Sequence, residues 1–417
     1  MRLKTVIRQL CNFKGFIITG CRICKQEKGI FTFEARKGSR GICSGCGKKF
    51  PSYDRLPVRF FEFIPFWGLK CFFEYSMRRV NCSSCGIKVE KVPWGDGKNN
   101  ITIHFRWFLA DWAKLLSWKT VAERYRTCWD TVRRAVEFAV SYGLEHRSPD
   151  GVDAIGVDEI QWKKGHKYLT VVYQLNGSAR RLLWVGRDRT IKSFNSFFDE
   201  MEKAQNGFCH GIRFLCSDMW KAYIKVAAKR LPGVIHILDR FHIMQKFSKA
   251  IDKIRAEEAR KLRKEGTPPV LKHSRWCFLK RPSNLTDKER FKLKDLLKMN
   301  IGVIRAYLLK EQFQLFWEYK SPPWARKFLD TWCDKANRSR LQPMKDISMM
   351  LQRHRDLILN WFKAKKQYNS GIVEGLNYKI NTMVRKAFGY RSYEVIETAL
   401  YHQLGDLPEP QFEHQFW

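Results

Sequence analysis

Two cysteine pairs of the same form constrain the N-terminal part of this chain more than any other feature of its sequence. Residues 42–50 read ICSGCGKKF and residues 81–89 read NCSSCGIKV, and in each a glycine directly follows the second cysteine. Such a pair with a tight turn supplies two thiolates, and two pairs complete the tetrahedral sulfur site of a structural zinc ion. The pattern therefore predicts a zinc site with four ligands: Cys43, Cys46, Cys82 and Cys85.

Two alternatives to this ligand set remain open from the sequence. A third pair, Cys21 and Cys24, is able to combine with Cys43 and Cys46 in place of the later pair. The second alternative is that these cysteines are ordinary small core residues. The 35 residues between the two similar pairs are more than in the commonest zinc patterns. A closed set of disulfides is excluded, since the chain has 13 cysteines, an odd number.

The charge of the chain predicts a polyanionic partner. The formal net charge is +37, while a hydrophobic content of 44% and an aromatic content of 14% argue against a disordered chain. A membrane surface is the weaker choice, because charged residues interrupt even the most apolar stretch, residues 58–77. No segment reaches the roughly 18–20 apolar residues that spanning a bilayer needs. We expect an intracellular protein that binds nucleic acid and no membrane.

Residues 101–146 read as helical and follow a turn-rich break at residues 92–100. Two short helical segments, 119–126 and 129–144, are separated by two residues, a length and spacing typical of a helix-turn-helix. The alternative is a plain helical hairpin. In the helix-turn-helix interpretation the second helix offers four side chains to DNA: Trp129, Thr131, Arg133 and Arg134.

The periodicity changes at about residue 152, where short β-branched or aromatic runs begin. The first three runs are closely spaced, as an antiparallel meander requires, and helical segments then alternate with two further runs. The order β-β-β-α-β-α-β predicts an α/β domain with a mixed sheet. The expected strands lie within residues 154–160, 167–175, 180–187, 212–218 and 234–239, and the expected helices are 193–205 and 219–231.

The following stretch, up to about residue 370, shows no strand-like alternation. It opens with a long basic amphipathic helix that Gly266 closes. Thr286 and Glu289 form a capping-box pattern, and Ser321 with Pro322 indicates another helix start. We predict an all-α insertion.

Three acidic residues need a reason in so basic a chain, since each repels phosphate unless a cation intervenes. Asp158 is predicted at the end of the first strand, and Asp218 ends another strand and precedes a helix, where functional groups collect in open α/β sheets. The alternative for Asp218 is a role as the N-cap of that helix, and the alternative for Asp158 is a strand-end residue that faces solvent. Glu374 falls on the polar flank of a predicted helix, 371–386, whose other polar members include Asn377, Asn381 and Arg385.

Four ordered motifs resemble the DDE-type insertion-sequence transposases of the ISL3 family. They are GVDEIQWKKGHKYLTVVY, CSDMWKAYIK, HILDRFHIMQKF and SGIVEGLNYKINTMVRKAFGYRSYE. The cysteine-rich segment from CSGCGKKF to KVEKVPW is similar to the zinc-binding head of that family. The resemblance runs from about residue 40 onward, and CRICKQE at 21–27 lies outside the usual family pattern.

The resemblance implies an RNase H-like catalytic domain with Asp158, Asp218 and Glu374 as an acidic triad. Carboxylates suit Mg²⁺ (or Mn²⁺) as the catalytic metal, which places magnesium at the triad and zinc in the head. Three residues of a family motif, Asp239, Arg240 and His242, together with Asn377, Asn381 and Arg385, are candidates for supporting roles. For the motif residues, ordinary capping or core positions are an equal alternative.

The implied organisation has five parts. They are a zinc-binding head (1–97), a helix-turn-helix region (98–150), the catalytic domain (151–240 and 366–404), the helical insertion (241–365) and a C-terminal tail (405–417).

The implied activity is cleavage of DNA at terminal inverted repeats and joining of the ends to target DNA, with double-stranded DNA as partner. The resemblance also implies a homodimer or larger assembly, in the cytoplasm of a bacterial-type cell and associated with the nucleoid. Two rival functions remain: a non-catalytic zinc-dependent DNA-binding regulator, and an RNase H-like nuclease or resolvase that cuts without joining.

Overall fold

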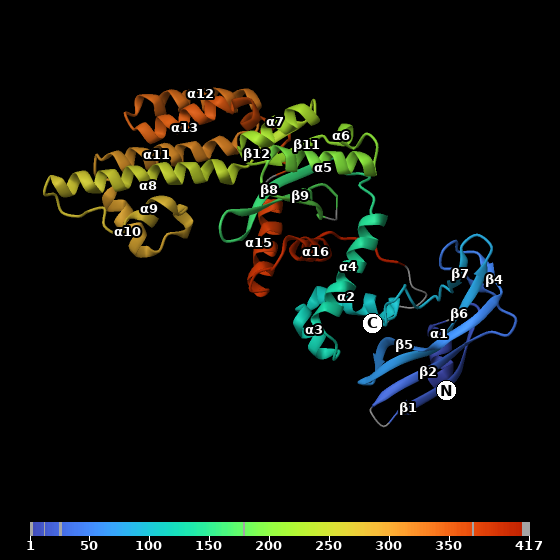
Figure 1. Ribbon diagram of the computed structural model, residues 1–417. Coiled ribbons are helices and arrows are strands. Elements are labelled where there is room, and N and C mark those ends of the chain that lie inside the picture. The colour runs from blue at the N-terminus through green and yellow to red at the C-terminus, as the bar shows by residue number, and fades with distance from the viewer. Residues whose placement is uncertain (1–2, 12, 25–26, 178–179, 369–370, 411–417) are drawn as a thin grey trace. The chain divides into compact units, whose positions relative to one another are not determined.

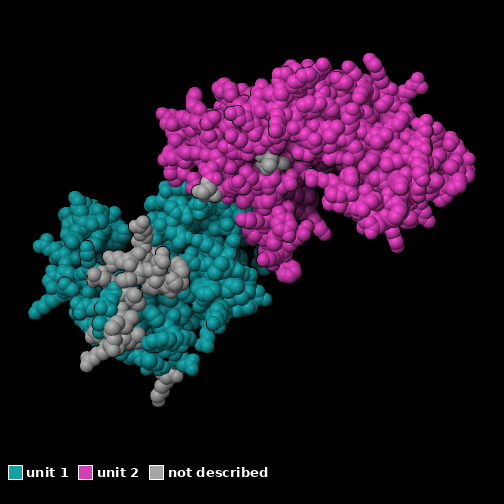
Figure 2. Space-filling view, turned by 180° about the vertical axis from the view of Figure 1, so that it is seen from behind, with its two compact units in different colours: residues 1–147, 391–417 teal, residues 148–390 magenta. Residues whose placement is uncertain are grey.

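The computed structural model describes residues 3–11, 13–24, 27–177, 180–368 and 371–410. The chain divides into two compact units, which Figure 2 shows in different colours: residues 1–147 with 391–417, and residues 148–390. The part of the predicted C-terminal tail beyond residue 410 lies outside the described residues.

The N-terminal unit begins with a curled sheet that carries the cysteine pairs. Its strands run in the order β1-β2-β6-β5, with β7 paired to β6, and a separate ribbon joins β3 to β4 (Figure 1). One face packs around Trp94, which is fully buried among aromatic rings that include Phe33 and Phe73. The elements are α1 (Leu3–Leu10), β1 (Phe16–Cys24), β2 (Lys28–Ala35), β3 (Gly41–Ile42), β4 (Lys49–Phe50), β5 (Ser52–Phe66), β6 (Leu69–Cys82) and β7 (Gly86–Val89).

The same unit continues with helices. The predicted pair is present as two helices with a short break, and it packs with the preceding helix. Thr102 and Ser117 start α2 and α3 by accepting hydrogen bonds from backbone N–H groups of the first turn. These helices are α2 (Ile103–Leu115), α3 (Trp118–Arg124) and α4 (Trp129–His146).

The C-terminal helix α16 (Tyr393–Leu404) also belongs to this unit, which differs from the expected boundary of 366–404 for the catalytic domain. It packs against α4, and the Gln403 side-chain amide donates to the carbonyl groups of Ala113 and Lys114. Leu407 lies against Gly143, so the start of the expected tail is part of the same unit. The apolar face of this helix therefore packs on the N-terminal helices.

The second unit contains a mixed five-stranded sheet in the order β10-β9-β8-β11-β12. The first three strands are antiparallel, and β8, β11 and β12 are parallel, which confirms the predicted mixed α/β arrangement. The strands are β8 (Ala154–Lys163), β9 (Lys167–Gln174), β10 (Leu182–Arg187), β11 (Phe214–Ser217) and β12 (Ile235–Leu238).

Helices cover both faces of this sheet. On one face, Ile155 and Val157 of β8 join a core cluster with α5 (Ile191–Ala204) and α7 (Lys221–Arg230). Successive strand residues point to opposite faces, so Gly156 and Asp158 face the other side. There α15 (Gly371–Lys386) packs against β8. A short helix not expected from the sequence, α6 (Phe208–Gly211), precedes β11.

Between β12 and α15 the described chain is helical, as predicted. The long helix α8 (Arg240–Lys264) starts directly after β12, and Gly266 follows its end with a positive φ. The Thr286–Glu289 capping box is formed, and Ser321 stands before a helix that begins with proline. The remaining elements are α9 (Arg275–Leu279), η1 (Pro282–Asn284), α10 (Asp287–Leu296), α11 (Gly302–Gln314), η2 (Leu315–Glu318), α12 (Pro322–Arg338), α13 (Gln342–Arg353) and α14 (Arg355–Lys363).

Among the described residues, no helix combines the length and apolar character needed to cross a bilayer.

Candidate functional site

Three aspartates lie where the parallel strands of the sheet stop pairing. The last β8–β11 pair joins Gly156 to Cys216, and Asp158 and Asp218 each follow two residues later. The last β11–β12 pair joins Ser217 to Leu238, so that Asp239 comes directly after it. The carboxyl edge of the three parallel strands therefore presents an acidic side chain from each.

Asp158 is not at the end of its strand, as the sequence suggested, but in the middle of it. β8 continues to Lys163 because its other edge stays paired with β9, where Asp158 faces Val171. The relevant boundary is the end of the pairing between β8 and β11. Asp158 thus lies at a fork in the sheet, where β11 no longer pairs with β8 but β9 still does.

Helix α15 reaches this fork because Gly156 lets it approach closely. A Cβ atom at Gly156 would lie 2.7 Å from the side chain of Val373 on α15. Two residues further along β8, Asp158 Oδ2 accepts a hydrogen bond of 2.6 Å from Asn377 Nδ2 on the same helix. A small residue on the strand and an amide on the helix therefore fix the helix against the acidic edge.

A buried tyrosine orients the same amide. The Tyr173 hydroxyl, on β9 opposite Gly156, donates to Asn377 Oδ1 at 2.7 Å. Because that oxygen accepts, the amide nitrogen is left to point at Asp158. The second carboxylate oxygen of Asp158 accepts the backbone N–H of Glu159 at 2.8 Å. Both oxygens of the carboxylate are held by the protein.

The aspartates act on one another electrostatically. Burial, with smaller contributions from the charges of Asp218 and Asp239, raises the pKa of Asp158 to about 6, while the Glu159 amide and His242 act in the opposite direction. Burial also raises the pKa of Asp218, with Asp239 acting in the same direction and the Trp220 amide, His242 and Lys246 opposing it. Mutual repulsion of this kind is relieved by a cation between the carboxylates.

Asp218 and Asp239 are oriented by the backbone that follows each of them. Asp218 Oδ1 accepts a hydrogen bond of 2.9 Å from the Trp220 N–H. This bond closes a turn that precedes α7, whose first residue is Lys221. Asp218 is thus not the N-cap of this helix, the alternative that the sequence left open. Asp239 is the N-cap of α8, and its other oxygen lies 3.5 Å from His242 Nε2.

Glu374 is exposed in the first turn of α15. Residues three apart share a helix flank, so Glu374 lies on the flank that Asn377 turns toward Asp158. In the described chain, the four cysteines discussed below are the only metal-ligating group with ligand atoms all within 4.8 Å. The carboxylates of Asp158, Asp218 and Glu374 are therefore not gathered that tightly.

The other predicted supporting residues have different surroundings. The Arg240 guanidinium lies over the ring of Trp317, 5.3 Å from its centroid. Asn381 and Arg385 are exposed on later turns of α15. Tyr173 and Lys246 could not be singled out from the sequence, since a tyrosine inside an apolar strand and a lysine on a basic helix carry no local signal of such a role.

The donors at the acidic edge fit a hard divalent cation. They are carboxylate oxygens on rigid strand ends, the type of ligand that Mg²⁺ and Mn²⁺ prefer, and no thiol is among them. Asp158 and Asp218 are partly buried, and each has one oxygen fixed by a backbone N–H group.

The structure brings Cys43, Cys46, Cys82 and Cys85 together, with all four sulfur atoms within 4.8 Å of one another. Cys46 Sγ and Cys82 Sγ are 3.5 Å apart, near the roughly 3.8 Å expected between sulfurs around one zinc ion with Zn–S bonds of about 2.3 Å. Gly47 and Gly86, the glycines after each pair, both have positive φ, as the predicted tight turns require. Cys21 and Cys24 instead lie on β1, outside this cluster.

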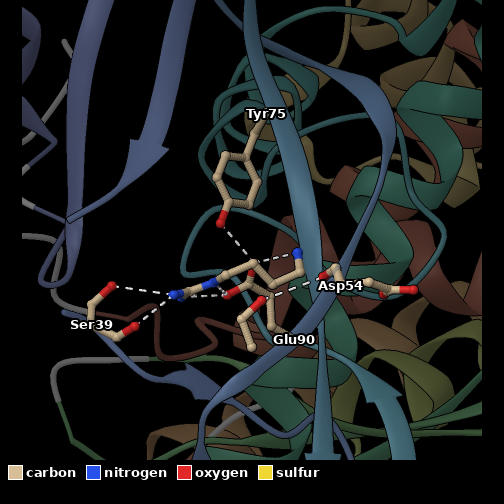
Figure 3. Close-up of polar contacts among 6 residues, drawn as sticks. Ser39, Asp54, Tyr75 and Glu90 are labelled. Atoms are coloured by element: carbon tan, nitrogen blue, oxygen red, sulfur yellow. Dashed lines mark hydrogen bonds and ion pairs between the residues drawn. The ribbon is translucent and has the colours of Figure 1, made fainter. Parts of the chain in front are cut away.

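A buried ion pair supports the strands that carry the cysteines (Figure 3). Glu90 accepts hydrogen bonds from the Tyr75 hydroxyl and from the backbone and side chain of Arg78, all at 2.7–2.8 Å. Arg78 also donates to the Ser39 carbonyl. The backbone of Glu90 forms an antiparallel β-bridge with that of Cys43, and Arg78 lies on the strand that ends at Cys82. The network ties both cysteine pairs to the head sheet.

The four side chains predicted to contact DNA lie at the start of α4. Trp129 is 40% exposed, and its ring is tilted against that of Trp118, with centroids 5.7 Å apart. Thr131 contacts the Cys128 sulfur. The two arginines make ion pairs within the helix, Arg133 with Asp130 and Glu137, and Arg134 with Asp130.

These features, a mixed α/β unit with an acidic strand edge and a separate four-cysteine head, occur in a chain whose residues 155–400 match a protein-family model described as a transposase of the DDE, ISL3 type. The match spans more than half of the chain. The chain belongs to the ISL3 family of DDE transposases.

Curated relatives agree with this assignment. The chain is 26% identical over 356 residues to the transposase for insertion sequence element IS1001 of Bordetella parapertussis, covering 85% of this chain and 86% of that protein. It is 29% identical over 383 residues to the transposase for insertion sequence element IS1557 of Mycobacterium tuberculosis, covering 85% and 83%. Among solved structures, the Drosophila P element transposase strand transfer complex aligns with a TM-score of 0.38 and 10% identity over 71% of this chain and 91% of that one.

Proposed function

We propose that this protein binds the terminal inverted repeats of its own insertion sequence, cleaves the DNA strands at the element ends and joins them to target DNA. The observation that carries the proposal is the placement of Asp158 and Asp218 on adjacent parallel strands, with α15 and its Glu374 docked against the first of them. Family membership supports the reaction class. The sheet order and the later helix support an RNase H-like catalytic domain with a helical insertion.

In this proposal Asp158, Asp218 and Glu374 hold the catalytic metal. When bound, Mg²⁺ or Mn²⁺ stabilises negative charge on the phosphate and activates the attacking water or 3′-hydroxyl. Asp158 is kept in one orientation by Asn377 and by the Glu159 amide. Asp239 and His242 add to the charge balance around Asp158 and Asp218. Glu374, exposed on the flank of α15 that Asn377 turns toward Asp158, would complete the ligand set.

The remaining parts of the chain serve DNA binding in this scheme. The cysteine cluster holds one zinc ion, and the α3–α4 pair acts as a helix-turn-helix with Trp129, Thr131, Arg133 and Arg134 toward DNA. The ion pairs of the two arginines within α4 are exchanged for phosphate contacts on binding. The ends of the element must be paired before joining, so the working species is a homodimer or larger assembly on nucleoid DNA in the cytoplasm.

The test is a strand-transfer assay with the purified full-length protein, paired element ends, magnesium and a plasmid target. We expect joined products from the wild type and none from Asp158→Asn, Asp218→Asn or Glu374→Gln, with DNA binding retained. Glu257→Gln, which changes an exposed carboxylate on α8, is the matched control and should join normally. Joining by any of the three triad variants at the wild-type rate would remove that residue from the triad.

The same assay separates the two rival functions. A regulator would bind the ends with the same affinity with or without magnesium and would leave every strand intact. A nuclease or resolvase would release cut ends but give no joined product. Strand-transfer products therefore distinguish the proposal from both.

A further inference from the structure

The helical part of the second unit contains a strongly basic region. Residues 260–298, here called the basic lobe, contain 13 lysines and arginines against 4 aspartates and glutamates. The lobe comprises the last turns of α8 together with α9, η1 and α10, and Figure 1 shows α9 and α10 beside α8. Its buried side chains include Cys277, Phe278 and Leu293, and the Phe278 ring packs against Tyr307 of α11.

Some cations near the lobe have a structural task. Lys280 pairs with Glu289, and Arg275 pairs with Asp252. The buried Lys310 donates to the Phe278 carbonyl. Most of the other cations are exposed and, within the described chain, have no carboxylate within 4 Å. They include Arg260, Arg263, Lys264, Arg281, Lys288 and Lys294.

Helix α10 presents an aromatic ring among such cations. Phe291 is 71% exposed, and Lys288 and Lys294 lie one turn before and one turn after it on the same flank. Trp276 on α9 is 53% exposed and has the Arg275 guanidinium 5.4 Å from its ring centroid. Exposed rings interleaved with unpaired cations are the surface that nucleic acid recognition uses, the cations for phosphates and the rings for sugars and bases.

The lobe extends along much of helix α8, since Arg275 of α9 pairs with Asp252 near the middle of that helix. Helix α8 therefore sets the greatest distance between the lobe and the acidic edge. Its N-cap is Asp239, a neighbour of Asp158 and Asp218, and it runs for 25 residues to Lys264. At 1.5 Å per residue this is about 37 Å. Duplex DNA rises about 3.4 Å per base pair, so the same length corresponds to about 11 base pairs, roughly one helical turn.

We propose that the basic lobe binds the backbone of duplex DNA within about one helical turn of the phosphate held at the acidic edge. The inference rests on the proposed function for the identity of the acting phosphate. It adds a second contact with DNA, separate from the helix-turn-helix region, that does not depend on sequence.

The test uses the full-length protein and a duplex that carries one element end, with Ca²⁺ in place of Mg²⁺, so that a cation neutralises the acidic edge while the strands stay intact. Hydroxyl-radical footprinting on wild type should protect the backbone at the element end and at a second place within about 11 base pairs of it. The triple variant Arg263→Ala, Lys288→Ala, Lys294→Ala should lose the second protection and keep the first. Its slope of log affinity against log salt should become shallower by about one for each residue replaced, about three in total.

A charge-matched control removes three exposed cations from α12 instead: Lys327→Ala, Lys335→Ala, Arg338→Ala. This variant should keep both protections and the wild-type salt slope. The proposal is overturned if the lobe variant retains the second protection, if its salt slope equals that of wild type, or if the control loses as much. A defect of the lobe variant in self-association alone, with unchanged DNA binding, would assign the lobe to a second copy of the chain. The salt slope also separates this proposal from the proposed function, because it is measured on binding and needs no strand transfer.

Discussion

The Asn377 amide on α15 donates a hydrogen bond of 2.6 Å to Asp158 on β8, 219 residues earlier in the chain. The opposite end of that amide accepts from the buried Tyr173 hydroxyl, so the side chain cannot rotate without breaking one of the two bonds. The helix that carries Glu374 is thereby attached to the strand that carries Asp158. Asn377 is a positioning residue for both.

Replacing Asn377 by alanine should weaken metal-dependent strand cleavage by about 10–100-fold, the usual effect of losing a group that orients a metal ligand. Half-maximal activity should need a higher magnesium concentration, because Asp158 becomes free to turn. Cleavage measured across a magnesium series reads both effects. Asn381→Ala, which changes an exposed amide one turn later, is the matched control and should behave as wild type. Equal losses in both variants would point to the helix and not to the Asp158 bond.

Glu90→Gln should destabilise the N-terminal unit by about 3–5 kcal/mol, because it leaves the buried Arg78 guanidinium without its charge partner. Urea unfolding of the full chain, followed by the fluorescence of the aromatic core around Trp94, measures the change. Asp54→Asn weakens the neighbouring pair with Arg79, in which both side chains are 39% exposed, and should change the stability far less, because solvent screens an exposed pair. A similar loss in the two variants would mean that burial of the pair is unimportant.

The stability of the same unit should fall as the pH drops from about 6.5 to about 4. Burial lowers the pKa of His104 to about 4, whereas the unfolded histidine titrates near 6.5. Between these values the unfolded chain binds a proton that the folded chain does not, so stability is lost on acidification, by about 3 kcal/mol for this group. Thermal unfolding should show a shallower pH dependence for His104→Phe, which suits the surrounding Phe13 and Phe63 rings.

His146→Gln, at an exposed position on α4, is the control for that experiment and should leave the pH dependence unchanged. A pH profile of His104→Phe that superimposes on that of wild type would show that His104 is not the group responsible.

The strand edge with its two aspartates could be predicted from the sequence because apolar runs with a terminal Asp report local structure directly. Asp218 indeed follows the last residue of β11. The position of Asp158 was less accurate, since the sequence cannot show that β9 keeps β8 extended beyond its pairing with β11. The closeness of Asp239 depends on the same parallel register, which no local pattern encodes.

Contacts between segments that are distant in the chain could not be predicted from the sequence for the same reason. Tyr173 reads as an ordinary core residue of a strand, and its bond to Asn377 exists only after the helix has docked on Gly156. The apolar face of α16 is clear in the sequence, but which surface covers it is not, and it packs on α4 instead of on the sheet. Periodicity defines a face, and tertiary structure selects its partner.

The cysteine cluster gives the remaining prediction, that metal analysis of the purified protein finds about one zinc per chain. The four sulfurs of Cys43, Cys46, Cys82 and Cys85 already lie within 4.8 Å, so the ion needs little rearrangement of the head. Because each ligand contributes to a closed tetrahedral site, Cys43→Ser or Cys82→Ser should lower the zinc content and the unfolding temperature of the N-terminal unit together. Cys21→Ser is the matched control, since Cys21 is exposed on β1 outside the cluster, and it should keep its zinc. About two zinc ions per chain, or one retained in the Cys43→Ser, Cys82→Ser double variant, would contradict this ligand set.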